Sequence, residues 1–360
     1  MERRPLFVAV TIAGTLAAIG ALVWWAQPYL DPVQVGQHVN ANAWQASYRE
    51  RGLTPPPGGP RDGYWQADLP KRLPDAEIGW AERELELPGR ISIDANGWQH
   101  YRSRHPDHKT IAILGGSVAL GAYASSDETV YFHRLGRRLD SDPRTAADIV
   151  IIASIAWKSS QEVAALARRT DSLDLDWVIA LDGLNDVTNG STAESLYSQK
   201  SETRDGSPWT LEYHAHDFLE RAVAYSKNIA AMHAVAAERN ARMMVVLQPA
   251  LFEREPMTPI EADLFRRVRD RFASIGHLRE TYAAMRKGLS LIADKTDLEV
   301  LDASRLFAGE PETTFTDLWH FADPGHELLA DAIADRLAPL LLEQATEEDD
   351  GDPQGAAPRG

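Results

Sequence analysis

Four polar residues in this chain have side chains that together could do chemistry at a carbonyl group. Ser117 follows two glycines, Asn185 lies in the run Gly183-Leu184-Asn185-Asp186, and Asp317 precedes His320 by three residues. A serine, an amide and an Asp/His pair can supply a nucleophile, an oxyanion donor, a general base and a carboxylate that orients the base. With this spacing both side chains can project from one turn, so that the carboxylate holds Nδ1–H and the other ring nitrogen takes the serine proton. The pattern predicts nucleophilic catalysis by Ser117.

The composition argues against several other kinds of chemistry. The chain has no cysteine, which excludes thiolate zinc sites, iron–sulfur clusters and a cysteine nucleophile. Its 37 basic and 53 acidic residues give a net charge of −16, which argues against nucleic-acid binding because phosphate contacts depend on clustered Lys and Arg. His214 and His216 alternate as metal ligands on a strand would, but no third ligand lies nearby and Asp217 is typical of a helix N-cap. We expect neither a metal ion nor an organic cofactor.

The elements that must position these residues follow from the hydrophobic pattern. Short apolar segments predict strands at 110–114, 149–154, 177–181, 243–247 and 298–301. Amphipathic segments predict helices at 130–139, 161–169, 218–239 and 325–342, the last with Asp323 as its N-cap and His326 in its first turn, packed behind the site. This alternation predicts a doubly wound, parallel α/β sheet with helices on both faces. Ligands bind beyond the carboxyl ends of such strands, where Ser117, Asn185 and the Asp/His pair are expected.

The first residues predict a membrane anchor. Residues 6–26 are a run of 21 residues without a charge, preceded by Arg3 and Arg4. At 1.5 Å per residue, such a helix crosses a hydrocarbon core of about 30 Å. The basic residues predict a cytoplasmic N-terminus, so residues 1–27 would hold the chain in the cell (inner) membrane with the remainder facing outward. Cleavage as a signal peptide is the alternative, and Trp24 disfavours it because cleavage sites require small residues.

Two further segments differ from the body of the chain in composition. Residues 28–105 form a lead-in that is interrupted by a Pro/Gly-rich stretch at 54–60 and contains Trp44, Trp65, Trp80 and Trp98. We expect these tryptophans to bury the lead-in against the domain that follows, with stacking on sugar rings as the alternative. Residues 343–360 carry six acids and one base without apolar periodicity and are expected to be disordered. The chemistry is then expected in residues 106–342.

At this point the chain resembles the SGNH (GDSL-like) hydrolase family. Four blocks follow one another in the family's order: Ile113-Leu114-Gly115-Gly116-Ser117, Trp157-Lys158-Ser159-Ser160-Gln161, Gly183-Leu184-Asn185-Asp186 and Asp317-Leu318-Trp319-His320. Upstream, Gly79-Trp80 and Asn96-Gly97-Trp98 look like the lead-in of membrane-anchored bacterial members. The common α/β-hydrolase elbow, G-x-S-x-G, is absent because Ala119 stands where its last glycine would be.

The resemblance implies a fold and a role for each site residue. The fold is a flavodoxin-like three-layer sandwich around a doubly wound, mostly parallel sheet of five strands. Ser117 is the nucleophile, His320 its base and Asp317 the carboxylate that orients the base. The backbone N–H groups of Ser117 and Ala156 and the side chain of Asn185 form the oxyanion hole. Asp186 is expected to be structural.

Two positions depart from the family pattern. Gly116 replaces the aspartate of the GDS spelling. Ala156 stands where the second block normally has a glycine, although the alignment could slide to Ser154. The resemblance implies that the first departure is tolerated, because that residue is not the nucleophile. The second keeps a backbone N–H but adds a methyl group, which bears on the shape of the oxyanion hole and the size of the acyl group more than on the class of reaction.

The sequence therefore predicts a membrane-anchored serine esterase or acylhydrolase that acts outside the cytoplasmic membrane on an acylated glycan or lipid. An O-acyltransferase that uses the same triad to modify envelope polysaccharide is one alternative. A catalytically silent, membrane-tethered protein that binds glycans or assists assembly is the other. No nucleic-acid partner is expected.

Overall fold

The computed structural model describes residues 32–57, 59–60, 72–75, 78–188, 217–269 and 275–351. The predicted anchor at 6–26, Trp65, the His214/His216 pair and residues 352–360 lie outside these ranges. Among the helices within them, none combines the length and the apolar character that crossing a membrane requires.

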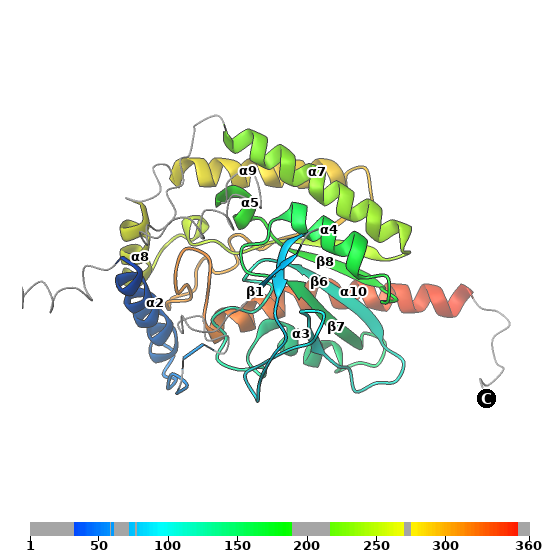
Figure 1. Cartoon of the computed structure of the whole chain (residues 1–360), viewed down its shortest axis with the longest axis horizontal. Helices are drawn as coiled ribbons and strands as arrows, with labels where there is room; N and C mark the ends of the chain where they lie inside the picture. The colour runs from blue at the N-terminus through cyan, green and yellow to red at the C-terminus, as the bar shows by residue number, and fades with distance from the viewer. Residues whose placement is uncertain are drawn as a thin grey trace, which may run out of the picture.

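A six-stranded sheet forms the centre of the molecule (Figure 1), in the order β10-β9-β8-β6-β7-β5. The strands are β5 (Gln99–Tyr101), β6 (Lys109–Gly115), β7 (Ala147–Ala153), β8 (Trp177–Asp182), β9 (Arg242–Leu247) and β10 (Glu299–Asp302). Strands β6 to β10 are parallel to their neighbours, and β5 pairs antiparallel with β7. The predicted parallel α/β sheet is confirmed, but the expectation of five strands is wrong because β5, from the lead-in, adds a sixth.

Helices cover both faces of this sheet (Figure 1). On one face lie α3 (Tyr131–Leu139) and α10 (Asp323–Gly351), and on the other lie α4 (Ser159–Arg169), α7 (Asp217–Glu238) and α9 (Ile275–Ala293). Shorter helices are α5 (Leu184–Thr188), the 3₁₀ turn η1 (Leu251–Glu253) and α8 (Pro259–Arg269). The helix α10 was predicted to end at Leu342, but no glycine or proline follows Pro339 until Gly351, and residues 343–351 are helical rather than disordered.

The buried side chains alternate along each strand, as two-sided burial requires. In β6, Ile111 and Ile113 pack on the α3/α10 face, and Ala112 and Leu114 pack on the α4/α7/α9 face. The strand β6 lies between β7 and β8. The chain adds β7 on one side of β6 and then crosses to the other side, where it adds β8, β9 and β10. The edge between β6 and β8 is therefore the switch point of the sheet, where ligands of such folds bind.

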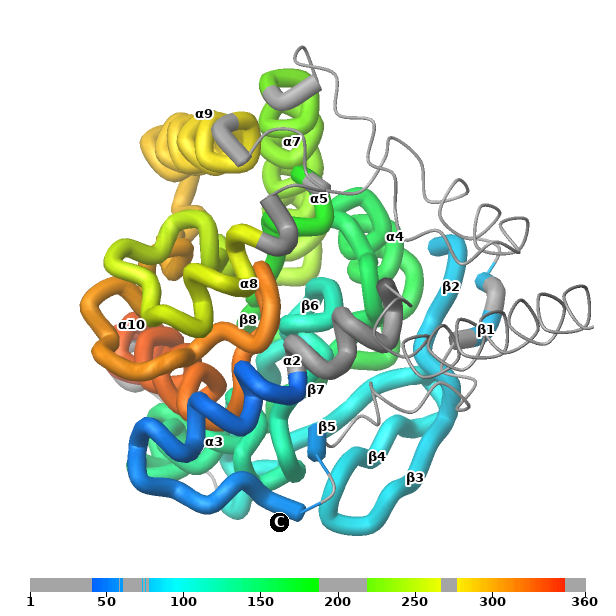
Figure 2. The backbone as a smooth tube through the Cα atoms, turned by 90° about the vertical axis from the view of Figure 1, so that its left-hand side faces the viewer, coloured from blue at the N-terminus to red at the C-terminus, as the bar shows by residue number. Residues whose placement is uncertain are grey.

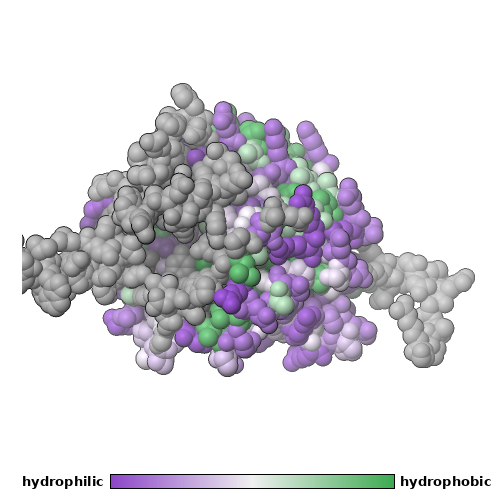
Figure 3. Space-filling model, in the orientation of Figure 1, coloured by the Kyte–Doolittle hydropathy of each residue, from purple (hydrophilic) through white to green (hydrophobic). Residues whose placement is uncertain are grey.

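The lead-in is part of the folded body. It contains α2 (Pro32–Arg49) and the short strands β1 (Arg72–Asp75), β2 (Gly79–Glu82), β3 (Leu85–Leu87) and β4 (Ile91–Ile93). Trp44, Trp80 and Trp98 are each at most 6% exposed, so their predicted burial is confirmed. Figure 2 shows α2 beside the loop that runs from β10 to α10. On the face seen in Figure 3, described residues are mostly hydrophilic, with small hydrophobic patches among them.

Candidate active site

Ser117, His320 and Asp317 form one continuous chain of hydrogen bonds. The Nε2 atom of His320 lies 2.8 Å from Ser117 Oγ, and its Nδ1 atom lies 2.7 Å from Asp317 Oδ2. Ser117 is 6% exposed and His320 is 2% exposed. Three residues that are up to 203 positions apart in the sequence are thus brought together as predicted. The arrangement lets the imidazole take the serine proton while the carboxylate holds the ring.

The position of Ser117 depends on Gly115, the last residue of β6. A Cβ atom at Gly115 would lie 2.3 Å from the carbonyl oxygen of Leu181 in β8, which no side chain could tolerate. The glycine therefore allows the chain to leave the sheet while touching the neighbouring strand. It then enters a tight turn, in which the N–H of Ala122 donates to the carbonyl of Ser117 at 3.0 Å.

His320 and Asp317 lie on a short closed loop before α10. The N–H of Thr316 donates to the carbonyl of His320 at 2.8 Å, and Phe315 pairs with Phe321 across an isolated antiparallel bridge. The Oδ1 atom of Asp317 accepts the N–H of His320 at 2.7 Å, which leaves Oδ2 for the imidazole. The sequence spacing of three residues works because this Asx-type turn brings both side chains to one side.

The electrostatic surroundings keep Asp317 ionised. Burial alone would raise the pKa of this carboxyl group, but the charge of His320 and the hydrogen bonds from His320 and Trp319 outweigh burial and lower it. An ionised carboxylate can stabilise an imidazolium that forms during proton transfer.

Asn185 lies directly behind the turn that carries Ser117. Its Nδ2 atom donates to the carbonyl of Trp157 at 2.8 Å, and an amide has a second N–H. A Cβ atom at Gly116 would lie 2.3 Å from that Nδ2 atom. A side chain at position 116 would therefore displace the amide of Asn185 from its present position.

Ala156 adopts a backbone conformation that glycine usually takes. Its φ is 65°, and the N–H of Trp157 donates to the carbonyl of Ser154 at 3.1 Å. These values define a type II turn over residues 154–157 with Ala156 at the position that favours glycine. The geometry supports the alignment of Ala156, rather than Ser154, with the glycine of the second block.

Residues of the lead-in hold the turn at 154–157 in place. The sequence did not predict this support. Ser154 Oγ donates to Glu82 Oε1 at 2.6 Å, and the N–H of Ile155 donates to the same oxygen at 3.1 Å. The indole of Trp80 donates to the carbonyl of Ile155 at 3.0 Å, and the indole of Trp157 donates to the carbonyl of Trp80 at 2.8 Å. The only sequence signal for Glu82 is its place on the buried side of a short alternating strand.

Asp186 makes structural contacts, as predicted. Its carboxylate accepts Ser159 Oγ at 2.5 Å and the N–H of Ser159 at 3.0 Å. Because Ser159 begins α4, this pair fixes the start of α4 against α5. The two blocks that carry Ala156 and Asn185 are thereby joined.

A buried group of acids lies behind these contacts. Glu162 is fully buried and Asp182 is 4% exposed, and a charge on Asp182 raises the cost of ionising Glu162. Tyr225 donates to Asp182 Oδ1 at 2.7 Å. Burial raises the pKa of Asp182 to about 7, and burial followed by repulsion from Asp182 raises the pKa of Glu162 well above its usual range. In the described part of the chain, no group of three or more acidic or histidine side chains could hold a metal ion.

His326 packs behind the site, against the turn that follows Ser117. It is fully buried in the first turn of α10, and its Nε2 atom lies 3.1 Å from the carbonyl of Ala122. Its ring stacks on Tyr131. This is the structural position that we expected for it.

Comparison with known proteins gives similarity at the level of the fold. No family model matches the chain, and no curated protein matches it either. A lipase from a goat rumen metagenome is 15% identical, with 64% of this chain and 97% of that chain covered and a TM-score of 0.44. The acetyl xylan esterase AlAXEase is 15% identical, with 63% and 99% covered and a TM-score of 0.42. Axe2, an acetylxylan esterase from Geobacillus stearothermophilus, is 14% identical, with 64% and 94% covered and a TM-score of 0.41.

All three proteins are lipases or esterases by name, and the likeness of this chain to them concerns the fold alone.

Proposed function

We propose that this protein is a serine ester hydrolase of the SGNH type. The observation that carries the proposal is the hydrogen-bonded chain from Ser117 through His320 to Asp317 at the carboxyl edge of the sheet. A buried serine 2.8 Å from an imidazole that is itself held by an ionised carboxylate is the arrangement that activates a hydroxyl group as a nucleophile.

The reaction follows from the atoms at hand. Ser117 Oγ attacks the ester carbonyl while His320 Nε2 takes the serine proton, and the carbonyl oxygen becomes an oxyanion. His320 returns the proton to the leaving alkoxide as the C–O bond breaks, which releases the alcohol and leaves an acyl-serine. Water, deprotonated by His320, then attacks the acyl-serine, and the acid leaves as Ser117 recovers its proton.

The oxyanion is stabilised by donors that surround the same point. The N–H groups of Ser117 and Ala156 and the amide of Asn185 supply them in this proposal. Each such donor can contribute about 3 kcal/mol to stabilisation of the transition state. Two observations support this assignment. The N–H of Ser154, at the start of the turn with Ala156, donates to the carbonyl of Gly115 at 3.3 Å, and the Nδ2 atom of Asn185 lies 2.3 Å from where a Cβ atom at Gly116 would be.

Turnover of a short-chain nitrophenyl ester tests the proposal. His320→Ala is expected to lower kcat/KM by orders of magnitude because the base is lost. His277→Ala is the matched control, since this histidine lies on α9 with its Nδ1 atom 3.1 Å from the carboxylate of Glu280. Equal activity of His320→Ala and wild type would contradict the proposal.

We also propose that the enzyme acts outside the cytoplasmic membrane on an O-acyl group of a glycan or lipid, held there by residues 6–26. The support is the uncharged run after Arg3 and Arg4. Sequencing the N-terminus of the protein purified from membranes tests the anchor. An intact N-terminus with the hydrolase domain accessible to external protease is expected, and a mature N-terminus near Gln27 would contradict it.

A further inference from the structure

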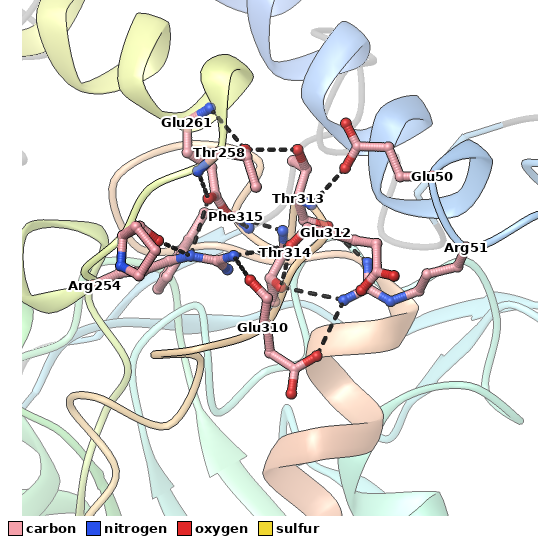
Figure 4. Close-up of polar contacts among 11 residues, drawn as sticks. Glu50, Arg51, Arg254, Thr258, Glu261, Glu310, Glu312, Thr313, Thr314 and Phe315 are labelled. Atoms are coloured by element: carbon pink, nitrogen blue, oxygen red, sulfur yellow. Dashed lines mark hydrogen bonds and ion pairs between the residues drawn. The ribbon is translucent and has the colours of Figure 1, made fainter.

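The end of helix α2 holds the loop that leads to Asp317 and His320. Glu50, directly after α2, accepts the N–H of Thr313 at 2.5 Å. Arg51 Nη1 donates to the carbonyl of Thr313 at 2.7 Å, and its Nη2 atom donates to Thr314 Oγ1 at 3.3 Å and lies 3.9 Å from the carboxylate of Glu310. Both backbone polar groups of Thr313 are therefore bound by consecutive charged side chains from the lead-in (Figure 4).

The buried ion pair of Arg254 and Glu261 binds the same loop from the other side. Arg254 and Glu261 are at most 1% exposed, and their charged atoms lie 3.0 Å apart. Arg254 Nη2 donates to the carbonyls of Glu310 and Glu312, at 2.7 and 2.9 Å. Glu261 Oε1 accepts the N–H groups of Thr314 and Phe315 at 2.9 and 3.1 Å. Figure 4 shows the loop between these two sets of side chains.

The loop held in this way continues directly into the site. Phe315 begins the closed segment that pairs with Phe321, and Asp317 and His320 lie between these two residues. Phe307, Phe315 and Phe321 also pack edge to face beneath it. A shift of Thr313 would therefore be transmitted within a few residues to the carboxylate that orients His320.

The helix α2 reaches His320 by a second route. The ring of Tyr123 stacks on that of His320, with the centroids 4.9 Å apart and the planes at 21°. Tyr123 has a φ of 70°, which is unusual for a residue with a side chain. Its carbonyl accepts the indole N–H of Trp44 at 2.9 Å. Trp44 thus helps to hold the strained residue that fixes one face of the imidazole.

We propose that α2 and the two residues after it are a positioning element for the Asp317–His320 pair, with Trp44, Glu50 and Arg51 as positioning residues. The inference rests on the proposed function, since it assigns a role within the same site. Trp44 sets the ring of His320 through Tyr123, and Glu50 with Arg51 sets the carboxylate of Asp317 through residues 313–316. The lead-in then contributes to catalysis by holding Asp317 and His320 in position.

The test compares variants of the full chain at the end of α2. Glu50→Ala/Arg51→Ala is expected to lower kcat for a nitrophenyl ester by about tenfold to a hundredfold with KM within about threefold, because a displacement near 1 Å at a reacting group costs about that much in rate. Glu50→Gln should retain most of the activity that Glu50→Ala loses, since its amide oxygen can still accept the N–H of Thr313. Arg49→Ala is the matched control, because the side chain of Arg49 is exposed and donates to Gln45 on the same helix.

A spectroscopic measurement separates this inference from the proposed function. The imidazole proton between His320 and Asp317 should give a downfield proton NMR signal, assigned by its loss in His320→Asn. We expect the signal in wild type and Arg49→Ala, and its broadening or loss in Glu50→Ala/Arg51→Ala while the thermal unfolding transition persists. A double variant with kcat within twofold of wild type and an unchanged signal would overturn the inference, as would an equal loss in Arg49→Ala. If wild type turns over no ester, the proposed function fails and the NMR comparison alone decides the positioning role.

Discussion

The proposed oxyanion hole depends on the close approach of two residues that lie far apart in the sequence. Gly116 and Asn185 are far apart in the chain, yet a Cβ atom at Gly116 would lie only 2.3 Å from Asn185 Nδ2. The absent side chain is what lets the amide approach the turn that carries Ser117.

Gly116→Ala is therefore expected to lower kcat without removing any triad member. The added methyl group must push the amide of Asn185 away, and loss of one oxyanion donor costs about a hundredfold to a thousandfold in kcat. Kinetics with a nitrophenyl ester measure the effect, and thermal unfolding of the same preparation controls for a loss of folded protein. Full activity in Gly116→Ala would show that Asn185 has no part in the reaction.

At the residue scale, much of the site could be predicted because its chemistry lies in residue types and short spacings. Asp317 and His320 needed only their separation of three residues, and Ser117 needed only its place after a glycine-rich strand end. The left-handed conformation of Ala156 could not be predicted, because alanine itself does not favour it. It is set by the surroundings of the turn, which come from another part of the chain.

At the scale of secondary-structure elements, the strand β2 supports the turn that follows β7. The strand β2 supplies the carboxylate of Glu82, which accepts two donors of the turn that follows β7. Glu82 is 6% exposed, so these donors have little access to water if it is removed. Buried donors without an acceptor cost about 1–3 kcal/mol each.

Glu82→Ala is expected to destabilise the protein by about 2 kcal/mol and to lower kcat, because the turn with Ala156 loses its brace. Urea unfolding and ester kinetics on the same preparation measure both effects. Glu84→Ala, an exposed acid two residues away, controls for the change of charge. Unchanged stability in Glu82→Ala would show that the turn at residues 154–157 does not depend on Glu82.

At this scale the sequence predicted the sheet and its helices well and the lead-in poorly. The strands β6 to β9 are mostly apolar and buried, which two-sided burial produces and which can be recognised directly. The strand β5 has three residues, one of them His100, and pairs at an edge. Such a segment acquires its structure from its partner β7 and has no periodic signal of its own.

For the molecule as a whole, the buried acids set an unusual dependence of stability on pH. Burial raises the pKa of Asp182 to about 7, so the folded state binds a proton more tightly than the unfolded chain. The contribution is then fully present below the unfolded pKa of about 4 and is lost as the pH rises through about 7. The raised pKa values of Glu162 and Asp186, both caused first by burial, act in the same direction.

We therefore expect the free energy of unfolding to fall between pH 5 and pH 7.5, by up to about 1.4 kcal/mol per pH unit for each proton. Urea unfolding at the two pH values measures it. In Asp182→Asn the fall should be smaller, since an amide does not titrate and its oxygen can still accept the hydroxyl of Tyr225. The same fall in both proteins would contradict the assignment to Asp182.

The acidic residues behind the net charge of −16 lie in different parts of the molecule. They do not mark a single acidic site: some of the acids are surface ion pairs such as Asp331 with Arg138, and others are buried beneath the helices that cover the sheet. The number of acids can be read from the sequence, but only the packing of α4 against β8 brings Glu162 and Asp182 together.

The account depends most on Ser117 being an activated nucleophile, and covalent labelling tests this directly. A fluorophosphonate probe reacts with a serine hydroxyl only when a base removes its proton, so the purified protein should be labelled. Peptide mapping should place the adduct on Ser117, and Ser117→Ala should abolish it. No labelling of the folded wild type, or labelling that persists in Ser117→Ala, would contradict the central claim.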